Sequence, residues 1–492
     1  MKAKNIKRAT VLLLIAAALL LVCSKSSPLY PLNDWMDANI FFTAGKSMMN
    51  GLVLYRDAFD HKGPLLYFLY GVGWLICHNG FFGVYLLETA AFALFLHFGL
   101  RSAELFVGAL SPWWAVVPGA LTACAKAFAH GGSAEEFCLP FLAAALYGLL
   151  RFLRGKDHPV PLSAVFVQGV LAGCVLWIKF TMMGFFLAWV VLLGGIYLKR
   201  RWGIRLLQST GAYLGGMGTA TLPWLVYFTL NGAVGDWLTA YLYDNLFLYA
   251  GRDAPVGLGQ QAYAFIQKLW WGVYDNWPLV LLAAAGFLFI LRLWRKTPAA
   301  ALALPVLAVG LAITSFLRGA YLVYYFLPYA VFAPLGLVPL AAIYRRRFPA
   351  SPPARRAVKC AVPVLCLALC LIGSGNTSQM LRSRAAMPQW QFAARMAAGD
   401  AVPTLLNYGT LDGGFYTAAG LLPPCQYFCV TNMPLPEQQQ QQDELLQAGG
   451  VTYIVALDGA LADRFLGYTR CAESRYDSGE GPRTWYLYRK TI

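Results

Sequence analysis

The feature that most constrains this chain is a series of apolar windows, each long enough, or nearly so, to cross a bilayer as a helix. Hydrophobic residues make up 59% of the 492-residue sequence and charged residues 13%, whereas soluble domains are usually about 45–50% apolar. The sequence therefore predicts a polytopic α-helical membrane protein with about eleven transmembrane helices. The candidate spans lie near residues 9–24, 81–100, 104–126, 139–152, 162–178, 182–198, 206–229, 277–293, 299–317, 321–342 and 357–374.

Cations outnumber acids, with 39 Lys and Arg against 23 Asp and Glu and a formal net charge of +16. The cations gather in short clusters between the apolar windows. This spacing follows the positive-inside rule of membrane proteins and argues against a nucleic-acid partner. The clusters lie at residues 151–156, 199–205, 292–296, 345–347 and 355–359.

The apolar segment 64–78 decides the topology. If it does not cross the membrane, the clusters after spans four, six, eight and ten share a side with the basic N-terminus, as the positive-inside rule requires. We therefore predict that residues 64–78 form a juxtamembrane helix on the outer face of the cytoplasmic membrane. The first span is expected to be an uncleaved anchor, and the odd number of spans places the C-terminus on the extracytoplasmic side.

Two domains are expected: a transmembrane domain over residues 1–374, with a first outer loop at 25–80, and an extracytoplasmic α/β domain over residues 375–492. Runs at 404–408, 451–457 and 484–488 favour strands, and residues 436–447 favour a helix. The glutamine run at 438–442 is interpreted as a solvated face of that helix.

Carboxylates occur in two of the predicted outer segments. Asp34 and Asp37 lie three residues apart, and so share one face if the segment is helical. Asp37 is predicted to be a general base held near the membrane surface, and Asp34 is assigned to a helix cap. Glu135 and Glu136 follow two glycines in another outer turn, where they could bind a divalent cation or an acceptor, or could simply be solvated.

Three cations beside apolar runs, Lys62, Lys179 and Arg318, are predicted on the outer side. A cation at the interface is suited to binding phosphate. The alternative for Lys179 and Arg318 is that each only extends to the headgroups. Arg56 and Asp57 lie in the same polar loop as Lys62, and polar clusters beside a span are functional-site hypotheses.

These residues carry a family resemblance. The segment from Gly51 to Asp57, then Lys62-Gly-Pro64, and the acidic turn at Glu135 and Glu136 together resemble the GT-C superfamily of membrane glycosyltransferases. The nearest branch contains the protein O-mannosyltransferases and the lipid A aminoarabinose transferases. Many relatives have Lys-Pro-Pro where this chain has Lys-Gly-Pro.

The resemblance implies a GT-C-like fold and an inverting transfer of a sugar from a polyprenyl-phosphate carrier to an acceptor glycan, lipid or protein outside the membrane. It implies Asp37 and Glu136 as catalytic residues, with Lys62 and Lys179 at the lipid phosphate. Asp34, Arg56, Asp57, Glu135 and Arg318 are the further substrate-binding candidates. No cofactor is firmly implied, and the doubled glutamate leaves a divalent cation open.

Two other functions fit the same composition. A lipid-linked glycan flippase or exporter would need many spans and cations, but its polar groups should line a path through the bilayer rather than gather at one face. A glycan polymerase would use the same class of substrate. The sequence contains no P-loop and no GxSxG motif, so ATP-driven transport and a serine nucleophile lack support.

Overall fold

A computed structural model describes residues 2–155, 158–249, 257–293, 298–317, 320–347, 352–457, 459, 461, 465, 467–479 and 481–491. The chain divides into two compact units. The span unit contains Met1–Cys23, Glu88–Trp224 and Asp253–Gly375, and the loop-and-tail unit contains Ser24–Leu87, Leu225–Arg252 and Asn376–Ile492. The loop-and-tail unit thus combines the predicted first outer loop and the predicted tail with a short middle segment.

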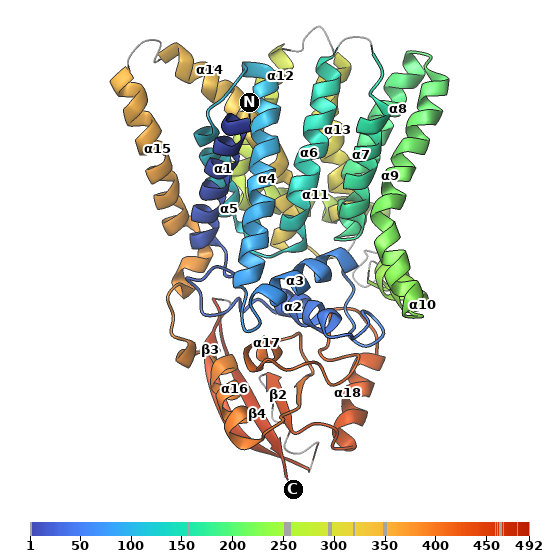
Figure 1. Cartoon of the computed structure of the whole chain (residues 1–492), viewed down its shortest axis with the longest axis vertical. Helices are drawn as coiled ribbons and strands as arrows, with labels where there is room; N and C mark the ends of the chain where they lie inside the picture. The colour runs from blue at the N-terminus through green and yellow to red at the C-terminus, as the bar shows by residue number, and fades with distance from the viewer. Residues whose placement is uncertain are drawn as a thin grey trace. The chain divides into compact units, whose positions relative to one another are not determined.

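The span unit is built from apolar helices (Figure 1). They are α1 (Lys2–Cys23), α4 (Phe82–Val107), α5 (Val116–Ala123), α6 (Ala134–Arg154), α7 (Leu162–Leu176), α8 (Met183–Lys199), α9 (Gly203–Leu230), α11 (Leu258–Asp275), α12 (Trp277–Leu293), α13 (Pro298–Phe316), η6 (Val323–Gly336), α14 (Leu337–Arg347) and α15 (Pro352–Gly373). The short 3-10 turns η1 (Pro112–Ala115), η2 (Lys126–Phe128) and η3 (Phe180–Met182) lie between them.

Among the described residues, 5 helices are long and apolar enough to cross a membrane, or 6 if the pair α11 and α12, bent by 95°, forms one span. Shorter apolar helices include Leu162–Leu176, Leu302–Phe316 and Lys359–Gly373. The chain is therefore a multi-pass membrane protein, while the count of about eleven spans stays a prediction. The predicted span 104–126 is not one helix, since α4 continues to Val107 and α5 begins at Val116.

Small residues allow close helix contact within the span unit. A Cβ atom on Gly184 of α8 would lie 2.0 Å from the carbonyl oxygen of Gly310 of α13, and one on Gly310 would lie 2.5 Å from the carbonyl oxygen of Gly184. Lipid tails are as apolar as leucine, so packing of this kind, rather than hydrophobic burial, holds membrane helices together.

The loop-and-tail unit begins with two packed helices, α2 (Met36–Met49) and α3 (Pro64–Ile76). The predicted helix at 64–78 is therefore present as α3, which starts with Pro64 in its first turn, where proline is tolerated. A Cβ atom on Gly45 of α2 would lie 2.5 Å from the amide nitrogen of Gly71 of α3. Only glycine allows so close a crossing of the two backbones.

The rest of this unit comprises α10 (Val234–Leu238), the π-helix η4 (Thr239–Leu248), η7 (Gly375–Gln379), η8 (Arg384–Ala386), α16 (Pro388–Gly399), α17 (Phe415–Ala419), α18 (Glu437–Gln447) and four strands. The strands β1 (Leu405–Tyr408), β2 (Tyr453–Leu457), β3 (Tyr468–Asp477) and β4 (Pro482–Lys490) form a sheet in the order β1-β2-β4-β3. β1 and β2 run parallel, and the other pairs are antiparallel.

The predicted α/β character of the tail is confirmed, with strands at the three predicted runs and α18 at the predicted helix. The interpretation of the glutamine run as a solvated face holds for Gln440, which is exposed, and is wrong for Gln438 and Gln442. Gln438 and Gln442 are 1% and 0% exposed, because α18 uses them to bind neighbouring backbone. β3 and α16 were not predicted.

Candidate functional site

The loop between α2 and α3 carries the conspicuous polar residues of the first predicted outer segment. Arg56 binds Asp57 through two parallel bonds of 2.9 Å, and its third contact is the carbonyl oxygen of Asn231 at 2.9 Å. Asp57 also accepts from the backbone of Val53 at 2.8 Å. The guanidinium of Arg56 and the Val53 amide hold the pKa of the Asp57 carboxyl below its usual value, despite partial burial. These residues thus close a turn, and Arg56, with 45% of its side chain exposed, stays open to solvent.

Both backbone polar groups of Lys62 form hydrogen bonds. Its amide nitrogen donates to the Tyr67 hydroxyl at 2.8 Å, and its carbonyl oxygen accepts from the Tyr55 hydroxyl at 2.7 Å. Tyr67 in turn donates to Asp60 at 2.7 Å. Burial raises the pKa of Tyr55 well above its usual value, with Tyr241 and Asp60 adding to the shift, so its hydroxyl stays protonated and remains a donor.

His61 stands beside the Lys62 ammonium. Asn245 uses its amide nitrogen to donate to the His61 carbonyl oxygen at 2.7 Å, so its side-chain oxygen faces His61 Nδ1 at 3.0 Å as an acceptor. His61 Nδ1 then carries the proton of the neutral ring, and Nε2, which also lies 3.8 Å from the Asp60 carboxylate, is left to accept from Lys62 Nζ at 3.3 Å. A buried imidazole in this state orients the ammonium without neutralising it.

Asp37 lies in the first turn of α2 and is half-buried. A carboxylate is favoured there because the amide groups at the start of a helix carry partial positive charge. Asp37 and Phe41 are four residues apart and share a face of α2. The Phe41 ring lies 6.3 Å from that of Tyr67, the residue that binds the Lys62 amide. Asp37 and Lys62 thus belong to the same unit.

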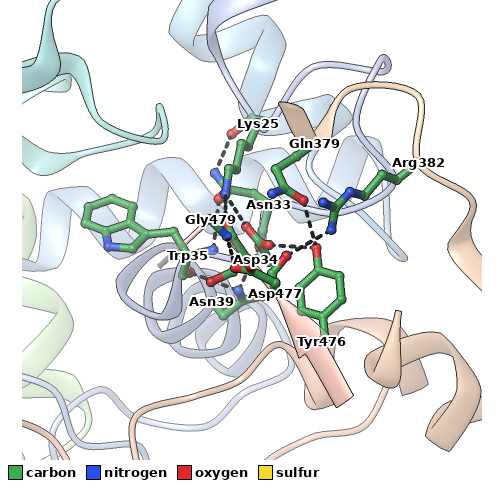
Figure 2. Close-up of polar contacts among 12 residues, drawn as sticks. Lys25, Asn33, Asp34, Trp35, Asn39, Gln379, Arg382, Tyr476, Asp477 and Gly479 are labelled. Carbon is green, nitrogen blue, oxygen red and sulfur yellow. Dashed lines mark hydrogen bonds and ion pairs between the residues drawn. The ribbon is translucent and has the colours of Figure 1, made fainter. Parts of the chain in front are cut away.

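Asp34 forms a buried ion pair rather than a cap. Figure 2 shows Lys25, Asp34 and Tyr476 pointing toward one another, with Lys25 Nζ 2.6 Å from one carboxylate oxygen and the Tyr476 hydroxyl donating to the other at 2.9 Å. The two charged side chains are 2% and 3% exposed. The prediction of a cap is wrong, since the cap position of α2 is Trp35 and no side chain caps that helix.

In the span unit, Lys179 and Glu135 form a second buried ion pair, with side chains 7% and 1% exposed. Lys179 precedes η3, and Glu135 lies in the first turn of α6. The ammonium also lies 4.2 Å from the Tyr325 ring centroid and 5.4 Å from that of Tyr324. This pocket of a carboxylate and two rings fits a cation in a site shielded from water.

Glu136 helps to cap α6. The Ser133 hydroxyl accepts from the Glu136 amide at 3.1 Å, and the Glu136 carboxylate accepts from the Gly132 amide at 2.9 Å. This reciprocal arrangement is a variant of the capping box, which the spacing Ser133-x-x-Glu136 indicates in sequence. Glu136 is 1% exposed, so the solvated alternative for this turn is wrong.

The structure thus places the predicted residues in two groups, one in each unit. Asp34, Asp37, Arg56, Asp57 and Lys62 belong to the loop-and-tail unit, and Glu135, Glu136 and Lys179 to the span unit. Arg318 lies outside the described residues. Among the residues that are described, no group of three His, Cys, Asp or Glu side chains could hold a metal ion.

The sequence reasoning missed Lys46, a buried lysine of α2. It is 1% exposed and donates to the carbonyl oxygens of Tyr416, at 3.0 Å, and Leu421. Burial lowers the pKa of Lys46 to about 8, although the nearby Asp412 opposes the shift. A lysine flanked by the apolar side chains of an amphipathic helix was the available signal. Asn245 was missed as well, because it lies 184 residues from His61 and only the fold brings it to the Lys62 region.

Neither a protein-family model nor a curated protein matches this sequence. The solved structures do provide matches. ArnT from Cupriavidus metallidurans, in a crystal structure bound to undecaprenyl phosphate, aligns with a TM-score of 0.58 and 14% identity over 99% of this chain and 98% of that chain. Its apo state aligns with a TM-score of 0.60 over the same shares.

The chain has the GT-C fold. An oligosaccharyltransferase from Archaeoglobus fulgidus also aligns, at a TM-score of 0.45 and 15% identity over 90% of this chain and 67% of that chain. The predicted fold class, a polytopic helical protein with a small α/β tail, is confirmed by the full-length alignment with ArnT. At 14% identity this similarity concerns the fold, so the activity has to be argued from the site.

Proposed function

We propose that this chain is an inverting glycosyltransferase that moves a sugar from a polyprenyl-phosphate carrier to an acceptor on the outer face of the cytoplasmic membrane. The observation that carries the proposal is the arrangement around Lys62. Its amide nitrogen and its carbonyl oxygen are both hydrogen-bonded, and His61 orients its ammonium. The GT-C fold supports it, because ArnT, which has the same fold, was crystallised with undecaprenyl phosphate.

The chemistry requires few groups. The acceptor atom attacks the anomeric carbon of the sugar while the bond from that carbon to the phosphate oxygen breaks, and the electron pair leaves on the phosphate. Lys62 stabilises the negative charge that develops on the departing phosphate. Asp37 takes the proton that the acceptor loses, a role that its place in the first turn of α2 and its partial exposure support.

Within the span unit, Lys179 is proposed as a phosphate-binding residue. Its ion pair with Glu135 keeps the ammonium charged and oriented beside Tyr324 and Tyr325. The phosphate of the donor gains a second negative charge as its bond to the sugar breaks, and it then competes for that ammonium more strongly than a single carboxylate does. In this proposal Glu135 is the counterion of Lys179 while no phosphate is bound. Glu136 affects the reaction indirectly, because it fixes the turn that starts α6.

Sugar transfer from a labelled pool of polyprenyl-phosphate sugars tests the proposal. Membranes carry the wild type, Asp37→Asn or Lys62→Met, and label is followed into lipid, protein and wall fractions. The matched controls are Asp400→Asn and Lys490→Met, which change a half-exposed and an exposed residue of the same unit. Loss of the base is expected to slow transfer by about 10²–10⁴-fold, and the labelled fraction identifies the acceptor class.

Equal transfer by the wild type and both site variants contradicts the assignment of Asp37 and Lys62. Accumulation of lipid-linked sugar on the inner face, without transfer by any variant, contradicts the transferase proposal and favours a flippase. Elongation of a lipid-linked glycan without label in other fractions favours a polymerase.

A further inference from the structure

A loop of the tail binds the backbone of the first predicted outer loop. The side chain of Gln426 donates to the Tyr55 carbonyl oxygen at 2.8 Å, and the carbonyl oxygen of Gln426 accepts from the Phe59 amide at 2.9 Å. The next residue, Tyr427, places its ring centroid 5.0 Å from that of Phe59. Residues separated by more than 360 positions in sequence are thus joined by two hydrogen bonds and a ring contact.

The segment that Gln426 holds is strained and lies directly before the Lys62 region. Tyr55 has φ of +68°, in the left-handed region that residues with a side chain rarely adopt. Such a conformation persists only where the surroundings impose it. The Tyr55 amide binds the Ala58 carbonyl oxygen at 2.9 Å, and the Tyr55 hydroxyl binds the Lys62 carbonyl oxygen at 2.7 Å. The backbone position of Tyr55 therefore helps to fix the Lys62 carbonyl group, while Tyr67 binds the Lys62 amide.

The tail loop is itself fixed by the glutamine run of α18. Gln441 accepts from the Tyr427 amide at 2.9 Å, and Gln442 donates to the Tyr427 carbonyl oxygen at 2.9 Å. Gln438 accepts from the Thr431 amide at 2.7 Å. In a loop outside helices and strands, buried backbone N–H and C=O groups need side chains as hydrogen-bond partners. Glutamine provides both an acceptor and a donor. These glutamine side chains thus provide the loop that carries Gln426 with hydrogen bonds that a neighbouring strand would otherwise provide.

We propose that Gln426 is a positioning residue, which acts through Tyr55 to place Lys62 for the lipid phosphate. The inference rests on the proposed function of Lys62. It gives the C-terminal domain a role in donor binding, because α18 fixes the loop around Tyr427, Gln426 fixes Tyr55 and Phe59, and Tyr55 fixes Lys62. No residue of the tail needs to touch the substrate for the tail to control its affinity.

The test compares Gln426→Ala and Gln426→Glu with the control Gln391→Ala in the full chain. Gln391 also donates to a backbone carbonyl oxygen, that of Ala385 at 2.8 Å, but in an exposed turn of the tail. Glutamate at position 426 keeps the shape and replaces the donor with an acceptor facing the Tyr55 oxygen, so its effect should exceed that of alanine. Amide hydrogen exchange over residues 55–62 and the affinity for undecaprenyl phosphate are both measured.

Loss of one hydrogen bond worth about 1 kcal/mol corresponds to about a five-fold change. Gln426→Ala is expected to speed exchange over residues 55–62 and to weaken undecaprenyl phosphate binding by about that factor, with a raised KM for the donor and little change in kcat. Gln391→Ala should change neither quantity. A merely structural residue would lower the amount of folded protein without changing the KM of the remainder.

Unchanged exchange over residues 55–62 in both Gln426 variants overturns the inference, and so does faster exchange with an unchanged donor KM. In either case a wild type that transfers sugar leaves the proposed function intact. A wild type that neither binds undecaprenyl phosphate nor transfers sugar contradicts the proposed function instead, and the role of Gln426 in phosphate binding is then rejected with it.

Discussion

Replacing Asp34 with asparagine is expected to destabilise the loop-and-tail unit strongly. Asp34 and Lys25 are 3% and 2% exposed, and their ion pair of 2.6 Å is buried. The substitution keeps the size of the side chain but leaves the Lys25 ammonium with the Ser478 carbonyl oxygen, 3.2 Å away, and no counterion at position 34. Breaking one side of a buried ion pair typically costs about 3–5 kcal/mol, because the remaining charge stays buried.

This cost converts into a measurable shift of the melting temperature. For proteins of about 150–250 residues, 1 kcal/mol shifts Tm by roughly 2–4 °C, so Asp34→Asn should lower the Tm of this unit by roughly 6–20 °C. Tyr476→Phe removes one hydrogen bond of 2.9 Å to the same carboxylate and should cost less, about 1.5–3 kcal/mol. The double variant Lys25→Met with Asp34→Leu removes both charges and should recover most of the loss.

Thermal unfolding of the full chain in detergent, combined with limited proteolysis of the tail, measures these effects. Asp400→Asn, in an exposed ion pair with Arg489, is the control and should leave Tm unchanged. The reasoning is refuted if Asp34→Asn melts like the wild type, or if the double variant is as unstable as the single one. Loss of sugar transfer at an unchanged Tm would instead support the sequence-based prediction that Asp34 binds substrate.

Three further predictions concern other buried polar groups. Ser133→Ala removes the cap of α6 and should cost about 1 kcal/mol of stability in thermal unfolding, whereas Ser111→Ala, at a cap position without a side-chain bond, should cost little. The folded pKa of Lys46, about 8, lies below its value of 10.5 in the unfolded chain, so stability should rise between pH 8 and 10.5 by up to roughly 3 kcal/mol. Lys46→Met should abolish that rise. Glu135→Gln should cost roughly 3–5 kcal/mol by leaving Lys179 buried without its counterion, and undecaprenyl phosphate should restore part of the Tm.

Each of these predictions has a result that contradicts it. Equal Tm values for the two serine variants would show that the Ser133 hydroxyl does not cap α6. A pH dependence that is the same in Lys46→Met and in the wild type would assign the rise to other groups. A Glu135→Gln variant that melts like the wild type would show that Lys179 finds another anion or loses its charge.

The sequence predicted the elements whose residues are apolar in a regular pattern. The strands at 404–408 and 451–457 are mostly apolar, and β1 and β2 are buried although β1 lies at one edge of the sheet. β3, at the other edge, could not be predicted because its residues are mostly polar and partly exposed. Composition therefore predicted the buried strands of the tail but not the exposed edge strand.

The candidate site was predictable in its residue types and less so in its contacts. Lys62 and Lys179 were singled out from their places beside apolar runs. The partner of Lys179, Glu135, is 44 residues away in sequence, and nothing in the local pattern joins them. The role of Glu136 in capping could have been derived from Ser133-x-x-Glu136, but two adjacent glutamates suggested a metal site instead. The burial of Gln438 and Gln442 could not be predicted, because composition alone does not show whether a glutamine side chain binds solvent or ordered backbone.

The long sequence separations within the loop-and-tail unit have a consequence for biogenesis. Asp34 and its hydrogen-bond donor Tyr476 are 442 residues apart. At about 5–20 residues per second, a ribosome needs roughly 20–90 s to synthesise that interval. During this time the Lys25 and Asp34 side chains and the segment around Tyr55 lack their last partners. The chain is therefore synthesised for most of its length with an incomplete loop-and-tail unit, and that unit is complete only after its final strands have been made and have folded against the first loop.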